Sequence, residues 1–174
     1  MRAFILAAVA TFGLDQLTKW YVVQWLDLFS RGEIDVFPPL VNFRMAWNQG
    51  VNFGLFSNSA DIVRWALIAV AVAISAWVIV WVRREKMAAI AQISAGLLVG
   101  GALGNVVDRL IYGAVADFLN MSCCGIENPY SFNVADIAVF AGAMGLVLFS
   151  GDAPKGRKQR LADAKRGIKR RKTP

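Results

Sequence analysis

Histidine is absent from all 174 residues, and the chain has two cysteines, Cys123 and Cys124, which are adjacent in sequence. Without histidine, the chain cannot build an imidazole metal site or a serine–histidine or cysteine–histidine nucleophile pair. Adjacent cysteines cannot form an ordinary disulfide framework or a CxxC metal knuckle. We therefore interpret the cysteine pair as structural, with a redox role as the alternative.

Positive charge is scarce outside the C-terminus. Residues 1–151 carry 9 Lys/Arg and 10 Asp/Glu, whereas residues 152–174 carry 10 Lys/Arg and 2 Asp. We expect residues 152–174 to be a disordered or weakly helical cytoplasmic tail that lies on the anionic inner leaflet or enforces topology. Nucleic-acid binding through charge is disfavoured, because no aromatic residue is interleaved. A docking arm of a non-enzymatic membrane adaptor is a further alternative.

Long apolar stretches dominate the rest of the chain. The apolar fraction is 57% and the mean hydropathy is +0.48, above the roughly 45–50% apolar usage of soluble domains. Four stretches approach the length of about 20 residues that crosses a bilayer as a helix: residues 3–26, 62–82, 87–115 and 132–150. Polar residues interrupt the first stretch where a signal peptide would be cleaved, so we expect this helix to be retained. The sequence predicts an all-α membrane protein with four transmembrane helices in a single domain, residues 1–151.

Loop charges predict the orientation of these helices. Arg83, Arg84 and Lys86 lie between the second and third stretches, and the basic tail follows the fourth. Positive charge marks the cytoplasmic side, so both termini are expected inside and loops 27–61 and 116–131 outside. Alternating apolar residues around Pro38-Pro39 predict a small extracytoplasmic β-sheet between the first two helices.

A stripe of small residues runs along the third stretch. Gly96, Gly100 and Gly104 recur at a spacing of four. Such stripes allow close helix approach in a membrane, so we interpret them as a packing surface.

Several ionisable residues interrupt the apolar stretches near their expected outer ends. Such groups are costly in a membrane and usually functional. The predicted topology places Asp117 at the outer end of the third helix and Asp136 about one turn inside the fourth. Two carboxylates held close in a partly dry site share a proton, as activation of a water molecule requires.

Two other readings of these residues stay open at this point. The carboxylates could relay protons in a small transporter or channel subunit. That function needs a polar path to the inner side, but the inner halves of the third and fourth helices offer only Gln92, Ser94 and Ser150. Alternatively, ion pairs within the sequence motifs, Asp15 with Lys19 and Asp108 with Arg109, could be purely structural.

Five motifs in one order carry a more specific signal. They are DQLTK (15–19), NQGVNFG (48–54), GNVVDR (104–109), VADF (115–118) and FNVAD (132–136). Together with four spans, they closely resemble the lipoprotein signal peptidase family, also called signal peptidase II. The resemblance implies an intramembrane aspartic endopeptidase of the bacterial inner membrane, with its active site near the outer face. Such an enzyme removes the signal peptide from diacylglyceryl-modified prolipoproteins just before the lipidated cysteine, without a metal or organic cofactor.

The resemblance also implies roles for individual residues. Asp117 and Asp136 would form the catalytic dyad, which Asn133 would orient. The residues expected to support the site or bind substrate are Asp15, Lys19, Asn48, Gly50, Asn105, Asp108 and Arg109.

The expected partners are diacylglyceryl-modified prolipoproteins and membrane lipids, not nucleic acid, and nothing in the sequence demands more than a monomer. The family folds as a four-helix membrane domain with a small periplasmic sheet and a loop over the site. Two departures from the family are visible: Asn52 stands where a small residue is common, and loop 119–131 matches no family pattern.

Overall fold

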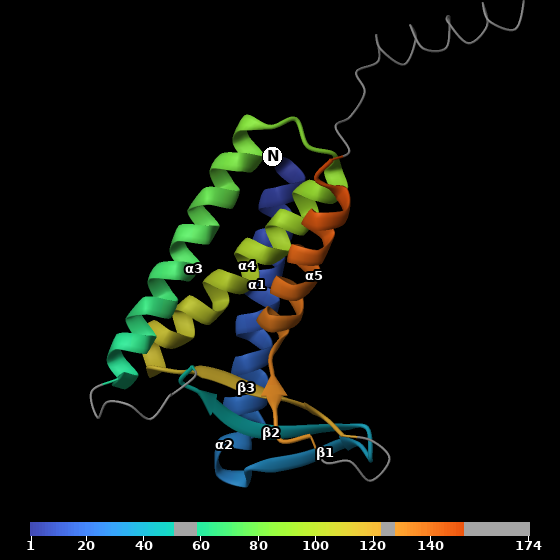
Figure 1. Cartoon of the computed structure of the whole chain (residues 1–174). Helices are drawn as coiled ribbons and strands as arrows, with labels where there is room; N and C mark the ends of the chain where they lie inside the picture. Colours follow the sequence, from blue (N-terminus) through green and yellow to red (C-terminus); the bar gives the residue numbers. More distant parts are fainter. Residues whose placement is uncertain (51–58, 123–127, 152–174) are drawn as a thin grey trace, which may run out of the picture.

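Four long helices and a small antiparallel sheet make up the protein (Figure 1). The computed structural model describes residues 1–50, 59–122 and 128–151. The long helices are α1 (Arg2–Lys19), which continues as the π-helix η1 (Trp20–Trp25), α3 (Ser59–Arg84), α4 (Ala89–Tyr112) and α5 (Val134–Phe149). A short helix, α2 (Leu28–Arg31), precedes the sheet. The predictions on Asn52, on Cys123-Cys124 and on the tail 152–174 lie outside the described residues.

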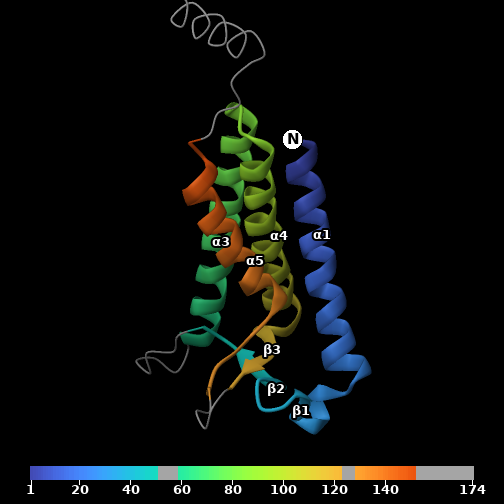
Figure 2. The ribbon, with the colours of Figure 1, turned by 90° about the vertical axis from the view of Figure 1, so that its right-hand side faces the viewer.

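Helix α4 contacts each of the other three long helices, and Figure 2 shows α4 lying between α1 and the pair of α3 and α5. The glycine stripe faces α1. A Cβ atom on Gly96 or Gly100 would lie 2.5 Å from the carbonyl oxygen of Phe4 or Ala8, respectively, and a Cβ on Gly104 would lie 2.5 Å from Oδ2 of Asp15. The packing interpretation of the stripe is confirmed. The absence of a side chain at Gly104 also lets the carboxylate of Asp15 lie directly against α4.

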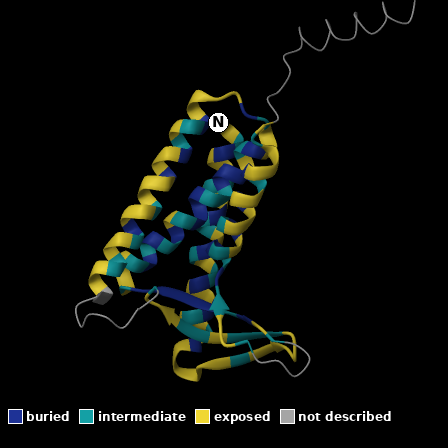
Figure 3. Ribbon diagram, in the orientation of Figure 1, coloured by how far each residue is buried: buried dark blue, intermediate teal, exposed yellow. Residues whose placement is uncertain are grey.

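Two of the four helices are long and apolar enough to cross a membrane by length and composition: Asp61–Arg84 and Ala89–Tyr112. The other two predicted spans do not meet these limits of length and composition. Helix α1 includes the charged residues Arg2, Asp15 and Lys19, and α5 has only 16 residues. The outward faces of the helices are largely exposed in Figure 3. They carry apolar side chains such as Phe140, which is 70% exposed.

The sheet has the strand order β1-β2-β3-β4 and is antiparallel throughout. Its strands are β1 (Glu33–Phe37), β2 (Val41–Asn48), β3 (Val115–Met121) and β4 (Ser131–Phe132). The predicted sheet between the first two helices is therefore present as β1 and β2. Residues 116–131, which were predicted as an outer loop with no strand assigned to it, in fact contribute most of β3 and the start of β4 to the sheet.

The end of the third long helix also required correction. Helix α4 stops at Tyr112, where Gly113 adopts a left-handed conformation with φ of 80°. Glycine adopts that conformation without steric cost and commonly ends a helix. Asp117 consequently lies on β3, not at a helix end. The predicted third stretch ran on to residue 115, because hydropathy alone does not mark the end of a helix and residues 113–115 carry no charge.

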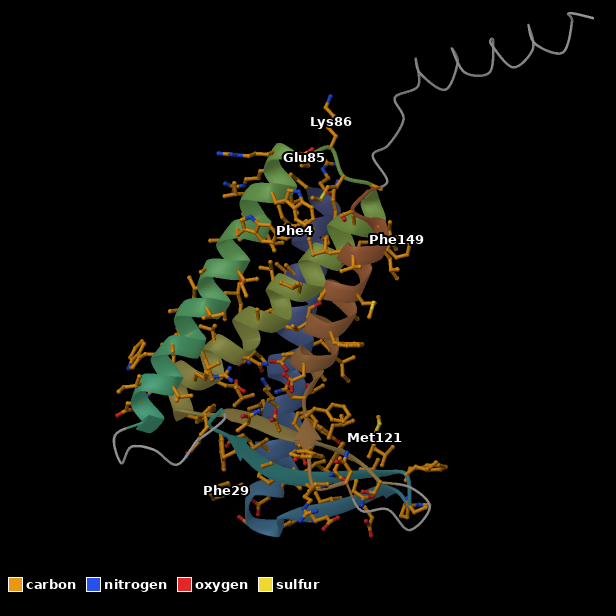
Figure 4. All side chains as sticks on the ribbon, in the orientation of Figure 1. Phe4, Phe29, Glu85, Lys86, Met121 and Phe149 are labelled. Carbon is orange, nitrogen blue, oxygen red and sulfur yellow. The ribbon has the colours of Figure 1, made fainter. Side chains whose placement is uncertain are left out.

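Two apolar clusters lie at opposite ends of the long helices. One contains Phe4, Val78 and Leu146 near the N-terminal end of α1, and the other contains Val22, Leu28 and Phe118 beneath the sheet. Figure 4 shows oxygen and nitrogen atoms gathered between them, where the helices meet the sheet. Among the described residues, the buried side chains of Asp15, Lys19, Asp108, Asp117 and Asn133 lie at this level.

Candidate active site

The carboxylates of Asp117 and Asp136 come from different elements and meet at one asparagine. Nδ2 of Asn133 donates a hydrogen bond to Oδ1 of Asp117 at 2.7 Å. The backbone N–H of Asn133 donates to Oδ2 of Asp136 at 3.2 Å, and the Asn133 side chain accepts from the backbone N–H of Asp136. Asn133 is thus the N-cap of α5 in a reciprocal capping box. The start of α5 and the dyad are built by the same side chain.

Two further amides complete the contacts to the pair. Nδ2 of Asn105, on α4, donates to Oδ1 of Asp136 at 2.9 Å. Nδ2 of Asn48, at the end of β2, donates to Oδ2 of Asp117 at 3.0 Å. The backbone N–H of Gly50 donates to Oδ1 of Asn48 and orients that amide. Gly50 has φ of 91°, and a Cβ there would lie within 3 Å of Val63 and Leu67, so this close turn requires glycine.

Burial of Asp117 and the neighbouring charge of Asp136 together raise the pKa of Asp117 to about 6. Asp117 is only 3% exposed, so its charged form is poorly solvated. A carboxyl with a pKa near neutrality can hold or release a proton at physiological pH. The pair therefore has the electrostatics that acid–base chemistry on water requires.

Lys19 is a buried cation at the centre of a second network. Its Nζ lies 2.9 Å from Asp15, 2.7 Å from Asp108 and 3.1 Å from Oδ1 of Asn105. The predicted pairing of Asp15 with Lys19 is confirmed. Through Asn105, the network connects Lys19 to Asp136.

The predicted pairing of Asp108 with Arg109 was wrong. Adjacent residues on a helix do not face each other, and Asp108 pairs with Lys19 of α1 instead. Nη1 of Arg109 donates to the backbone oxygen of Asn105 at 3.3 Å. Nε of Arg109 has no hydrogen-bond partner among the described residues. Arg109 thus lies beside the dyad with donor capacity to spare.

The two carboxylates that bind Lys19 also hold the backbone next to the dyad. Oδ1 of Asp15 accepts from the N–H of Ala135 at 2.9 Å, one residue before Asp136. Oδ2 of Asp108 accepts from the N–H of Ala116 at 3.2 Å, one residue before Asp117. Lys19 therefore neutralises the two groups that position the dyad-bearing segments.

Sequence reasoning missed one member of this network, Gln16. Its Nε2 donates to Asp15, to Asp108 and to the carbonyl of Gly104 at 3.1–3.3 Å. The signal was available, since Gln16 is the second residue of the DQLTK motif.

The structure brings the predicted site residues into one connected region at the junction of helices and sheet: Asp15, Lys19, Asn48, Gly50, Asn105, Asp108, Arg109, Asp117, Asn133 and Asp136. Within the described ranges, no group of three or more His, Cys, Asp or Glu side chains is arranged to hold a metal ion.

The protein is thus a bundle of apolar helices with a carboxylate pair, one buried and one half-buried, where the helices meet a small sheet. The fold is similar to two solved structures of bacterial membrane enzymes, both 25% identical to this chain. One has a TM-score of 0.72 over 85% of this chain and 92% of its own, and the other a TM-score of 0.69 over 85% and 87%.

The chain belongs to the signal peptidase II family, whose sequence model, described as Signal peptidase (SPase) II, matches residues 7–151. It is 42% identical to a lipoprotein signal peptidase of Methylobacterium radiotolerans, over 94% of both chains. It is 41% identical to a lipoprotein signal peptidase of Methylorubrum extorquens, over 86% of this chain and 85% of that protein. The family identified from the five motifs is confirmed, and with it a membrane-bound peptidase.

Proposed function

We propose that this protein is an intramembrane aspartic endopeptidase that removes the signal peptide from diacylglyceryl-modified prolipoproteins, cleaving just before the lipidated cysteine. The names of its relatives support prolipoproteins as the substrate class. The observation that carries the aspartic mechanism is Asn133, which hydrogen-bonds both Asp117 and Asp136. A buried asparagine that contacts two carboxylates holds them as one acid–base unit.

In the proposed mechanism, the ionised member of the pair takes a proton from a water molecule as its oxygen attacks the scissile carbonyl. The protonated member gives its proton to the substrate, and the C–N bond then breaks as the leaving nitrogen gains a proton. The raised pKa of Asp117 supports this division, because it lets one proton be shared near neutral pH. The amides of Asn48, Asn105 and Asn133 hold the carboxyls in position during both steps.

We also propose that all four long helices span the bacterial inner membrane, with both termini cytoplasmic and the dyad near the outer face. The apolar outward faces of α1 and α5 support this placement, for example Leu6 at 70% exposure and Val147 at 79%. η1 extends α1 by six residues, from Trp20 to Trp25, which gives that helix the length that crossing requires. At this depth the site can draw water from outside while meeting a substrate anchored in lipid.

The proposed enzyme works as a monomer, needs no metal or organic cofactor, and interacts with membrane lipids. The substrate helix enters sideways from the bilayer, with its diacylglyceryl chains remaining in lipid. The C-terminal segment 152–174 is proposed to be a basic cytoplasmic tail that is dispensable for chemistry.

The test is cleavage of a diacylglyceryl-modified prolipoprotein by the purified wild type, Asp117→Asn and Asp136→Asn. Asparagine keeps the shape of aspartate but cannot exchange the proton. Asp35→Asn is the matched control, since Asp35 is exposed on β1. We expect the control to cleave normally and both dyad variants to be inert while retaining the helical circular dichroism of the wild type. Cleavage at a near wild-type rate by either dyad variant would refute the dyad.

A further inference from the structure

A cavity of about 480 Å³ lies on the other side of β3 from the proposed dyad. Trp47 and Ala116 pair across β2 and β3, and both line this cavity. Successive side chains of a strand point to opposite faces, so Asp117 and Asn48 face away from it, toward each other. The cavity is thus separate from the pair of carboxylates, although Lys19 and Asp108 form part of its wall.

Aromatic side chains line much of this cavity. Trp20, Phe29, Trp47 and Tyr112 come from η1, α2, β2 and α4, and they remain 58%, 65%, 39% and 53% exposed. Figure 4 labels Phe29 beside α2, at the sheet end of the molecule. Large aromatic groups left exposed around a concave site are typical of a binding site rather than of a packed core. Trp47 and Tyr112 are in contact, with ring centroids 5.6 Å apart.

The charged groups of the cavity leave an excess of negative charge. Among the described residues, Lys19 is the only basic residue of the lining, and the carboxylates of Asp15 and Asp108 neutralise it. A further lining carboxylate, that of Asp27, is exposed. Its Oδ1 accepts from Ser30 at 2.8 Å. An anionic ligand would therefore be repelled, whereas a cation would find a carboxylate beside aromatic faces, the combination that binds ammonium groups.

The apolar walls of the cavity favour a ligand that also carries an apolar part. Val23 and Phe29 line the cavity together with the indoles, and the cavity lies at the end of α1 where the helices meet the sheet. In the proposed membrane placement, on which this inference rests, that level is the outer headgroup region. A ligand there would be an amphiphile, with its polar head in the cavity and its chains in lipid.

We propose that this cavity binds the primary ammonium group of an amphiphile. Two sources carry that chemistry: the ethanolamine headgroup of a phospholipid, and the new α-amine of a lipidated cysteine after cleavage. In both, the ammonium group contacts the Asp27 carboxylate and the aromatic walls. The chains lie along the apolar side of the cavity.

The test is ¹⁹F NMR of the full chain labelled with 5-fluorotryptophan in a non-ionic detergent. Single Trp→Phe variants assign the resonances of Trp20 and Trp47, and Trp77 and Trp81, on the distant part of α3, serve as internal controls. The titrants are short-chain phosphatidylethanolamine, phosphatidylglycerol with the same chains, and S-diacylglyceryl-cysteine amide with its amine free or acetylated. We expect saturable shifts of Trp20 and Trp47 with ethanolamine lipid, with free-amine cysteine, or with both. The relative affinities then identify the source.

Asp27→Asn tests the carboxylate without disturbing the backbone. Asp27 has φ of 53°, a left-handed conformation that asparagine also tolerates, and an amide oxygen can still accept from Ser30. We expect this variant to bind the ammonium amphiphile about threefold to tenfold more weakly, and the control Asp35→Asn to bind normally. Equal affinity for phosphatidylglycerol, for acetylated cysteine or for Asp27→Asn would overturn the proposal, as would shifts that never saturate. The measurement requires no cleavage, so failure of the peptidase assignment would not imitate failure here.

Discussion

Replacing Asp117 by asparagine should make the stability of the protein less dependent on pH. The pKa of Asp117 is about 6 in the folded chain, against an ordinary value of 3.8. Because the folded value is raised, folding favours the protonated carboxyl. The resulting stabilisation is complete below about pH 3.8 and is lost as the pH rises through about 6. A difference of about two pKa units corresponds to about 3 kcal/mol between the two limits.

Asparagine removes this titration and adds a constant cost. Both carboxylate oxygens of Asp117 accept from amide N–H groups, those of Asn48 and Asn133, whereas asparagine offers only one oxygen. One hydrogen bond should therefore be lost at every pH, at about 1–3 kcal/mol. The variant should accordingly be less stable than wild type at pH 4, and its deficit should shrink or reverse by pH 8.

The assay is the midpoint of thermal unfolding in detergent between pH 4 and pH 8, followed by circular dichroism. The quantity of interest is the difference between variant and wild type at each pH, so titration of other groups cancels. Asp35→Asn should give a flat difference, because Asp35 is exposed. Asp136→Asn should shift the Asp117 transition to lower pH, because the charge of Asp136 helps to raise that pKa. A flat difference for Asp117→Asn, or a deficit that grows with pH, would refute the reasoning.

Three other changes test the framework around the pair. Lys19→Met leaves the carboxylates of Asp15 and Asp108 buried without a cation, and should cost about 3–5 kcal/mol in the unfolding free energy; an unchanged melting midpoint would contradict this. Gly104→Ala should lower the free energy of unfolding by about 1–3 kcal/mol, because the added methyl group overpacks against Asp15. Gly13→Ala is the control: no atom lies within 4 Å of the added Cβ, so this change should leave the free energy of unfolding unchanged or raise it by about 0.5–1 kcal/mol. Asn133→Ser can still cap α5 but is too short to bridge the carboxyls. Its unfolding free energy should fall by about 1–3 kcal/mol, because the hydrogen bond from Asn133 to Asp117 is lost. Cleavage should fall at least about 100-fold by loss of positioning; retained cleavage would show that the bridge is dispensable.

Local patterns were sufficient to predict much of this architecture. The four apolar stretches correspond to four long helices because hydropathy and helix length are properties of consecutive residues. The close packing of α4 could also be predicted from a local pattern, because glycines at a spacing of four lie on one face of a helix. The five motifs indicated the family and the residues that now lie together, because each motif is a short contiguous sequence.

Other features depended on contacts between distant segments and could not be read locally. Strand β3 was predicted as an outer loop in all but its first residue, because its pairing with β2 joins segments that are far apart in sequence. Asp108 pairs with Lys19, 89 positions away in sequence, rather than with its neighbour Arg109. The role of Gln16 also depends on α4, which supplies two of its three acceptors.

The sequence by itself determined the family, the helical character of the chain and the residue types of the proposed site, all of which are encoded in short stretches. The tertiary structure alone decided how these residues are joined. Asn133 holds two carboxylates from a strand and a helix, Lys19 neutralises acids on two helices, and a cavity opens on the opposite face of β3. The physical reason is that hydrogen bonds, ion pairs and burial act through space, and their partners here are separated by up to 120 residues of chain.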